Sequence, residues 1–217
     1  MEKISILEAG SRPKKILALG AHADDIEIGC GGTILRLASK FRDLDVLWIV
    51  FSATAERAAE ARASAGAFLA GAAHARVIVG NHRDGFLPYA GSAVKDEFET
   101  FKQEFVPDLV LTHYRNDLHQ DHRLISELTW NTFRDHLILE YEIPKYDGDI
   151  GTPNFFVQLD AALCKQKVDN ILRCFASQRG KAWFAEDTFY AMLRLRGLES
   201  NAPEKYAEAF YCRKVVY

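Results

Sequence analysis

Short, uniformly apolar segments alternate along this chain with longer segments of helical periodicity. Residues 15–20 (Lys-Ile-Leu-Ala-Leu-Gly) and 46–51 (Val-Leu-Trp-Ile-Val-Phe) are of the first kind. They are too uniformly apolar for strands with one face in water, so we expect buried strands of a parallel sheet. Between them, residues 31–38 are expected to begin a helix, because their apolar side chains recur at roughly helical spacing. The three segments form a βαβ unit.

The same alternation continues to the end of the chain, without repeats or linkers. Its 217 residues suit one sizeable core, so a single domain spanning residues 1–217 is expected. The pattern predicts an α/β fold, a Rossmann-like three-layer sandwich with a mostly parallel sheet. The further expected strands are 77–79, 109–112, 137–141, 155–159 and one within 209–216, and the further expected helices are 55–71, 94–105, 121–135, 161–176 and 187–195.

Composition and charge exclude several classes of protein. Twenty-seven Lys and Arg against thirty Asp and Glu give a formal net charge of -3, so there is no basic field to attract nucleic acid. The apolar runs are far shorter than the ~20 residues of a transmembrane helix. The acidic start of the chain, residues 1–8, lacks the pattern of a secretory signal.

The cysteines indicate a reducing environment. Cys30, Cys164, Cys174 and Cys212 lie far apart, and none forms a C-x-x-C pair. This spacing argues against a zinc site made of cysteines and suggests reduced thiols in the cytoplasm.

A first group of titratable residues follows the first expected strand. His22, Asp24 and Asp25 lie between that strand and the glycines of 29–32, where a Rossmann protein binds a dinucleotide. Two adjacent carboxylates would repel a pyrophosphate, but they suit a divalent cation. The alternative is that these residues only form a turn and cap a helix.

A second group follows the strand expected at 109–112. Three of the seven histidines, His113, His119 and His122, lie here together with Asp117 and Asp121. Ligands of such folds bind beyond the carboxyl ends of the strands, so the loops after residues 20, 51, 80 and 112 should line one crevice. His22, Asp25 and either His119 or His122 would then make a three-ligand site with an open position, which is typical of catalytic zinc.

These two motifs in combination resemble the PIG-L/LmbE family of metal-dependent N-deacetylases. The family usually has Pro at position 23 and Glu at position 26, where this chain has Ala23 and Ile26. Weaker similarities extend the resemblance over most of the chain. The residues that resemble the family are His22-x-Asp24-Asp25 with Gly29-x-Gly31-Gly32, His119-x-Asp121-His122-Arg123, Arg57-x-x-Glu60, Arg83-Asp84-Gly85 and Ser177-Gln178.

The resemblance implies a role for each matching residue. It makes His22, Asp25 and His122 the ligands of Zn²⁺, with Fe²⁺ or another divalent metal as the alternative. Asp24 would be the general base, and His119 the oxyanion stabiliser or acid, oriented by Asp121. Arg57 and Arg83 are candidates for substrate contacts, and the alternative for both is a solvated surface charge.

The expected activity is removal of an acetyl group from an N-acetylated amino sugar that is free, nucleotide-linked or part of a glycan or antibiotic precursor. One alternative is an amidase acting on another small-molecule or thiol conjugate. The other is a nucleotide-binding Rossmann module without catalysis, against which the absence of G-x-G-x-x-G counts. The expected partner is a small-molecule substrate. A homo-oligomer is compatible with the sequence.

Overall fold

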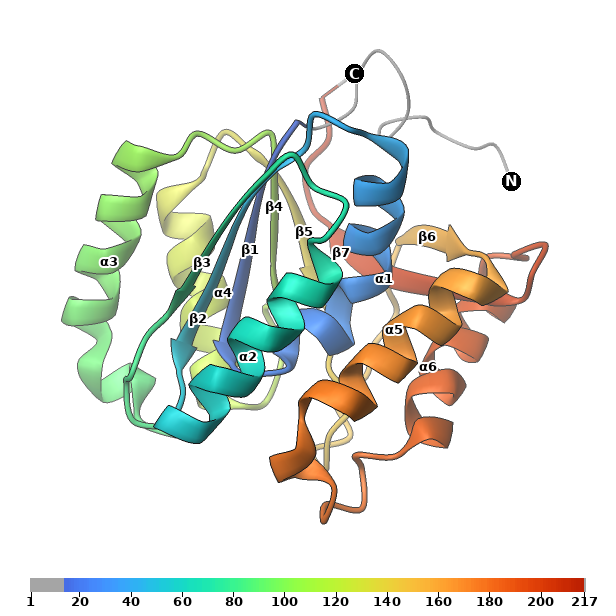
Figure 1. The fold of residues 1–217 in the computed structure, drawn as a ribbon. Helices are drawn as coiled ribbons and strands as arrows, with labels where there is room; N and C mark the ends of the chain where they lie inside the picture. The colour runs from blue at the N-terminus through green and yellow to red at the C-terminus, as the bar shows by residue number, and fades with distance from the viewer. Residues whose placement is uncertain (1–13, 217) are drawn as a thin grey trace.

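A computed structural model describes residues 14–216, so the prediction about residues 1–8 lies outside the described part of the chain. That part contains seven strands and six α-helices, which alternate up to β5; β6 then follows β5, and α5 and α6 precede β7 (Figure 1). The strands are β1 Lys15–His22, β2 Asp45–Ser52, β3 His74–Val79, β4 Leu109–His113, β5 Leu137–Tyr141, β6 Phe155–Leu159 and β7 Tyr206–Cys212. The helices are α1 Asp25–Lys40, α2 Ala55–Phe68, α3 Gly91–Glu104, α4 Gln120–Thr132, α5 Ala161–Cys174 and α6 Glu186–Glu199, with 3-10 turns at Leu87–Ala90 and Ala176–Gln178.

All seven strands form one sheet in the order β3-β2-β1-β4-β5-β7-β6. The first five strands in this order are parallel, and β7 pairs antiparallel with both β5 and β6. The chain moves outward from β1 to β3 and then returns to add β4 on the other side of β1. This reversal is the topological switch point, where α/β folds form their ligand-binding crevice.

Helices cover both faces of the sheet, as Figure 1 shows: α1, α2 and α5 lie on one face, and α3 and α4 on the other. Alternate residues of β1 point to opposite faces. Ile16 and Ala18 belong to the core under the first set of helices, whereas Leu17 and Leu19 belong to the core under the second. The predicted three-layer α/β sandwich with a mostly parallel sheet is confirmed.

Helix α1 begins at Asp25, earlier than the helix expected from residue 31. The glycines at 29–32 therefore lie inside the helix and not in a loop. Their role is close packing. A Cβ on Gly29 would lie 2.1 Å from Cδ2 of Tyr141, and one on Gly31 would lie 2.5 Å from Cε1 of Phe68. Missing side chains let α1 approach β5 and α2 at this point.

Smaller differences concern element ends. Helix α6 continues to Glu199, beyond the expected residue 195, and β7 lies at Tyr206–Cys212, earlier than the expected 209–216. All four cysteines are free thiols. Among residues 14–216, no helix combines the length and apolarity needed to cross a membrane.

Candidate metal centre

The loops at the carboxyl ends of β1 to β4 line one cleft of about 740 Å³. The segments at 143–146 and 178–183 form its remaining wall. The cleft therefore lies at the switch point, as the strand order requires. The lining side chains that matter below are His22, Asp24, Asp25, Ile28, Arg57, Arg83, Asp84, His119, His122, Pro144, Tyr146, Gln178 and Trp183.

His22, Asp25 and His122 converge in this cleft, although His22 and His122 are a hundred residues apart. Nδ1 of His22 lies 3.2 Å from Nε2 of His122 and 3.4 Å from Oδ2 of Asp25. Nε2 of His122 lies 3.6 Å from Oδ1 of Asp25. Ligands held ~2.0–2.2 Å from one tetrahedral metal are separated by distances of this size.

Carboxylates bind the other nitrogen of each of these histidines. Nε2 of His22 lies 3.1 Å from Oδ2 of Asp121 and 3.1 Å from Oδ1 of Asp84. Nδ1 of His122 lies 3.0 Å from Oδ2 of Asp117. These bonds leave Nδ1 of His22 and Nε2 of His122, the two nitrogens that a cation would bind, facing each other at 3.2 Å. Once both are free of protons, these nitrogens and the Asp25 carboxylate fit a shared divalent cation.

The electrostatics of the cluster also favour a cation. Burial alone would lower the pKa of His22, but hydrogen bonds with Asp121, Asp25 and Asp84 raise it well above its usual value, so without a metal this ring holds a second proton that a bound cation would displace. Burial and the nearby His113 lower the pKa of His122 to about 4, so this ring is neutral, as a metal ligand must be. The cluster attracts positive charge and holds a neutral imidazole beside it.

Further ligand combinations overlap with this one. Ligand atoms also come within 4.8 Å of one another in the groups His22–His119–His122, Asp25–His113–His122 and His22–Asp84–Asp121. The first adds His119 to the two facing histidines, and its ring stacks on that of His122 with centroids 4.6 Å apart. One cation site therefore has several polar groups around it.

Asp24 lies at the start of α1 in a left-handed conformation, with φ at +98°. Such backbone strain in a non-glycine residue is typical of functional sites. One oxygen, Oδ1, lies 3.0 Å from the Arg57 guanidinium, and the other, Oδ2, has no hydrogen-bond partner among the described residues. Burial raises the pKa of Asp24 to about 7, although Arg57 opposes the rise. A carboxylate with that pKa suits a general base.

His119 and Asp121 contact each other through the backbone of Asp121. The Asp121 carboxylate binds Nε2 of His22 and accepts from the backbone N–H groups of Gly85 (2.8 Å) and Leu87 (3.1 Å). It is the backbone N–H of Asp121 that donates to Nδ1 of His119, over 3.2 Å. Nδ1 is thus an acceptor, which leaves the ring proton on Nε2.

The support of His119 by Asp121 that the resemblance implies stays a prediction. Burial and the charge of His22 lower the pKa of His119, and they outweigh the charge of Asp121, which raises this pKa. Helix α4 begins at Gln120, so His119 caps the helix with its ring, while the carboxylate of Asp121 binds His22 at the end of β1. His119 can still donate a hydrogen bond, as a neutral ring.

The two arginines have protein partners at the cleft wall. Arg57 binds Asp24 and the carbonyl of Ala23, and it lines the cleft. The Arg83 guanidinium stacks over the ring of Phe86, 3.5 Å from its centroid, and also lines the cleft. Arg57 is therefore placed to act on Asp24, and substrate contacts of both arginines stay predictions.

Three residues belong to the site for which the sequence reasoning had no firm role. Asp84 and Asp117 bind the histidines as described above. His113 is fully buried, and its Nε2 accepts from the backbone N–H of Ala21 at 2.9 Å and lies 3.2 Å from Oδ2 of Asp25. Their position at the ends of β3 and β4 was the available signal, but spacing along the chain does not show which ring each one contacts.

Comparison with known proteins identifies relatives of this chain. The model of the PIG-L family, described as GlcNAc-PI de-N-acetylase, matches residues 17–133, more than half of the chain. The uncharacterized deacetylase YaiS of Escherichia coli (strain K12) is 49% identical over 43 residues, which are 18% of this chain and 23% of that protein. The match thus spans about a quarter of the curated relative.

Solved structures extend the similarity in fold. N,N'-diacetylchitobiose deacetylase from Pyrococcus horikoshii is 21% identical with a TM-score of 0.72, covering 93% of this chain and 84% of that one. GalB, the 4-carboxy-2-hydroxymuconate hydratase from Pseudomonas putida KT2440, is 16% identical with a TM-score of 0.76, covering 94% and 98%. At such identities the likeness shows a shared fold. With the family model spanning β1 to α4, and therefore the whole histidine and aspartate cluster, the chain belongs to the PIG-L family.

Proposed function

We propose that this protein is a divalent-metal-dependent hydrolase that removes the acetyl group from an N-acetylated amino sugar. The observation that supports it most is the pair of facing nitrogens on His22 and His122, each fixed by a carboxylate on its other side. With Asp25 they form a set of two nitrogens and one carboxylate, which is a common zinc site. Fe²⁺ or another divalent metal is the alternative with the same ligands.

Each residue of the site has a part in amide hydrolysis. A bound Zn²⁺ would polarise the amide carbonyl and lower the pKa of a water molecule. Asp24, whose Oδ2 has no hydrogen-bond partner within residues 14–216, would accept the proton of the attacking water. Nε2–H of His119 would donate a hydrogen bond to the carbonyl oxygen as negative charge develops there. Protonated Asp24 would then return its proton to the leaving amine.

The amino-sugar substrate rests on the family and on the wall of the cleft. The family description names a de-N-acetylase of a GlcNAc compound, and the similar Pyrococcus enzyme is a chitobiose deacetylase. Trp183 lines the cleft, and its ring offers a surface on which a sugar can stack. Nucleotide binding without catalysis is disfavoured, because Asp24 and Asp25 lie at the N-terminus of α1, where a phosphate would bind.

The test is acetate release from a panel of free, nucleotide-linked and lipid-linked acetamido sugars. We expect release from at least one member, loss of activity after chelation, and recovery with about one equivalent of Zn²⁺ or Fe²⁺ per chain. Purified protein that binds no divalent metal under these conditions would contradict the proposal. Metal binding without acetate release from any acetamido sugar would instead favour another amide as substrate.

A further inference from the structure

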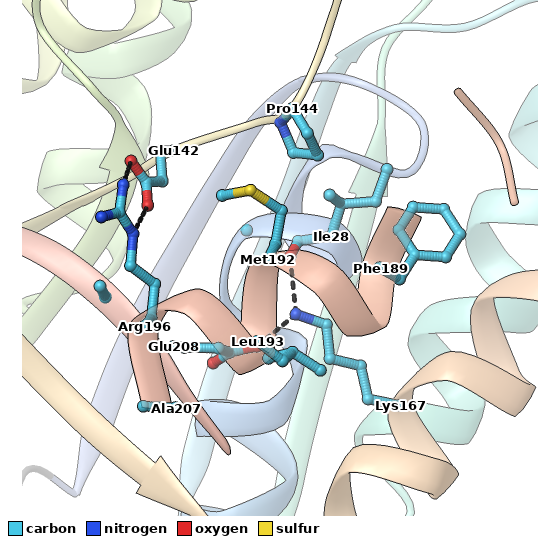
Figure 2. A pocket seen from close by; sticks show the side chains of 12 residues that line it. Ile28, Glu142, Pro144, Lys167, Phe189, Met192, Leu193, Arg196, Ala207 and Glu208 are labelled. Atoms are coloured by element: carbon cyan, nitrogen blue, oxygen red, sulfur yellow. Dashed lines mark hydrogen bonds and ion pairs between the residues drawn. The ribbon is translucent and has the colours of Figure 1, made fainter. Parts of the chain in front are cut away.

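A second, smaller cavity adjoins the cleft. It measures about 30 Å³, and Ile28 and Pro144 line both spaces. Figure 2 shows it between these two residues, Phe189 and Met192. A space of this size accommodates about two or three water-sized groups.

The charged residues around the cavity are paired with one another. Nζ of Lys167 lies 2.6 Å from Oε1 of Glu208 and donates to the carbonyl of Ile28 at 2.7 Å. The Arg196 guanidinium donates to both oxygens of Glu142, at 2.6 and 2.9 Å. With these charges neutralised, the surface that remains for a ligand consists of Ile28, Pro144, Phe189, Met192, Leu193, Ala207 and Ala209. An apolar group therefore fits, and a charged one does not.

The cavity shares Ile28 and Pro144 with the cleft that contains the candidate reacting groups. Ile28 follows Asp24 and Asp25 by four and three residues, so it is their neighbour on the same face of α1. An amide substrate extends in two directions from its carbonyl carbon. The cleft of about 740 Å³ suits the sugar, and the cavity of about 30 Å³ suits the end of a short chain.

We propose that this cavity binds the acyl chain of the substrate, and that the enzyme accepts N-acyl groups about two carbons longer than acetyl. The proposal rests on the proposed function for its orientation of the amide. Met192 is the residue that can close the space, because it is partly exposed and contributes a flexible side chain to the lining.

The binding experiment compares acetate with butyrate, the products of acetyl and butyryl hydrolysis, by calorimetry on the zinc-loaded protein. We expect butyrate to bind about tenfold more tightly, the gain from burying two methylene groups. Met192→Trp should fill the cavity and abolish that gain. Leu195→Trp is the matched control, because it adds the same side chain to an exposed position of α6 and should preserve the gain.

A kinetic experiment uses N-acetyl- and N-butyrylglucosamine with the same three proteins. The ratio of kcat/KM for butyryl to that for acetyl should fall at least tenfold in Met192→Trp and stay constant in Leu195→Trp. Equal binding of acetate and butyrate, or a butyrate gain that survives Met192→Trp, would overturn the acyl cavity. A butyrate gain that Met192→Trp abolishes, in a protein that hydrolyses neither sugar, would support the cavity while contradicting the proposed amino-sugar substrate.

Discussion

His22 and His122 show how single residues build this site. Each ring has one nitrogen on a carboxylate and presents the other to its neighbour, where a cation can bind both. Carboxylates that hold a ligating histidine in this way raise its basicity and fix its orientation. Asp84, Asp117 and Asp121 are therefore expected to act on the metal through the histidines.

The first prediction concerns Asp121. Asp121→Asn should lower metal affinity by roughly 10–100-fold, because it weakens the hydrogen bond that orients His22. Competition with a chromophoric chelator would measure the change. An unaltered metal affinity would contradict this prediction. If the alkaline limb of the pH–rate profile also moved to lower pH, Asp121 would act on His119 instead, as the resemblance implies.

Asp24 should be needed for turnover and not for metal binding. Asp24→Ala removes a base and none of the three converging ligand atoms, so turnover should fall by a factor on the order of 10²–10⁴. Metal content, measured by elemental analysis, should stay near that of the native protein. Loss of the metal in this variant would mean that Asp24 is itself a ligand.

Arg57 should set the pH at which Asp24 becomes active. The guanidinium lowers the pKa of Asp24, which burial raises to about 7. Removing that charge in Arg57→Met should raise this pKa further, so the base is protonated at higher pH. The acidic limb of the rate profile should move upward by about one pH unit. Arg62→Met, an exposed arginine of the same helix, should leave the limb in place.

At the scale of elements, a buried ion pair joins α1 to α5 and β7. The Glu208 carboxylate accepts from the backbone N–H groups of Gly32 (2.7 Å) and Thr33 (2.6 Å). Its partner Lys167 donates to the carbonyl of Ile28. The pair thus binds backbone groups within α1 itself, the helix that begins with Asp25, and it connects the C-terminal part of the chain to the candidate metal centre.

Glu208→Gln should destabilise the fold strongly. It leaves the Lys167 ammonium buried without a countercharge, a change that costs about 3–5 kcal/mol in comparable pairs. Chemical denaturation would measure the free energy of unfolding. Glu127→Gln makes the same chemical change at an exposed position of α4 and should stay within ~0.5 kcal/mol of the native value. Similar effects of the two substitutions would show that the pair contributes little.

Glu27 links the whole molecule's stability to pH. Its side chain is fully buried in α1, and neither oxygen has a hydrogen-bond partner among the described residues. Burial raises its pKa to about 8, against 4.5 ordinarily. The folded protein therefore keeps a proton that the unfolded chain releases between these values. By linkage, this group makes the fold less stable as pH rises from about 4.5 to about 8.

Glu27→Gln removes that titration and should stabilise the protein at the alkaline end of this range. The difference in Tm between Glu27→Gln and the native protein should grow steadily from pH 5 to pH 8, as scanning calorimetry would show. A difference that stays constant over the range would mean that Glu27 does not titrate there.

The sequence by itself determined the layered α/β architecture and the end of the sheet at which the site lies. A uniformly apolar run indicates a strand that is buried on both faces, and apolar residues at helical spacing indicate a helix that is buried on one face. The order of strands and helices can therefore be inferred from short segments of sequence. The crevice then follows from a general property of parallel sheets. The PIG-L resemblance came from two short motifs, His22 to Asp25 and His119 to Arg123.

Only the tertiary structure decided how the side chains pair. Asp121 binds His22 across 99 positions, and Arg57 binds Asp24 across 33. The glycines at 29 and 31 face Tyr141 and Phe68, which leave no room for a side chain opposite them. The cavity beside Ile28 exists because α5, α6 and β7 meet there. Periodicity and spacing describe neighbours along the chain, whereas these contacts arise from the packing of elements that are distant in it.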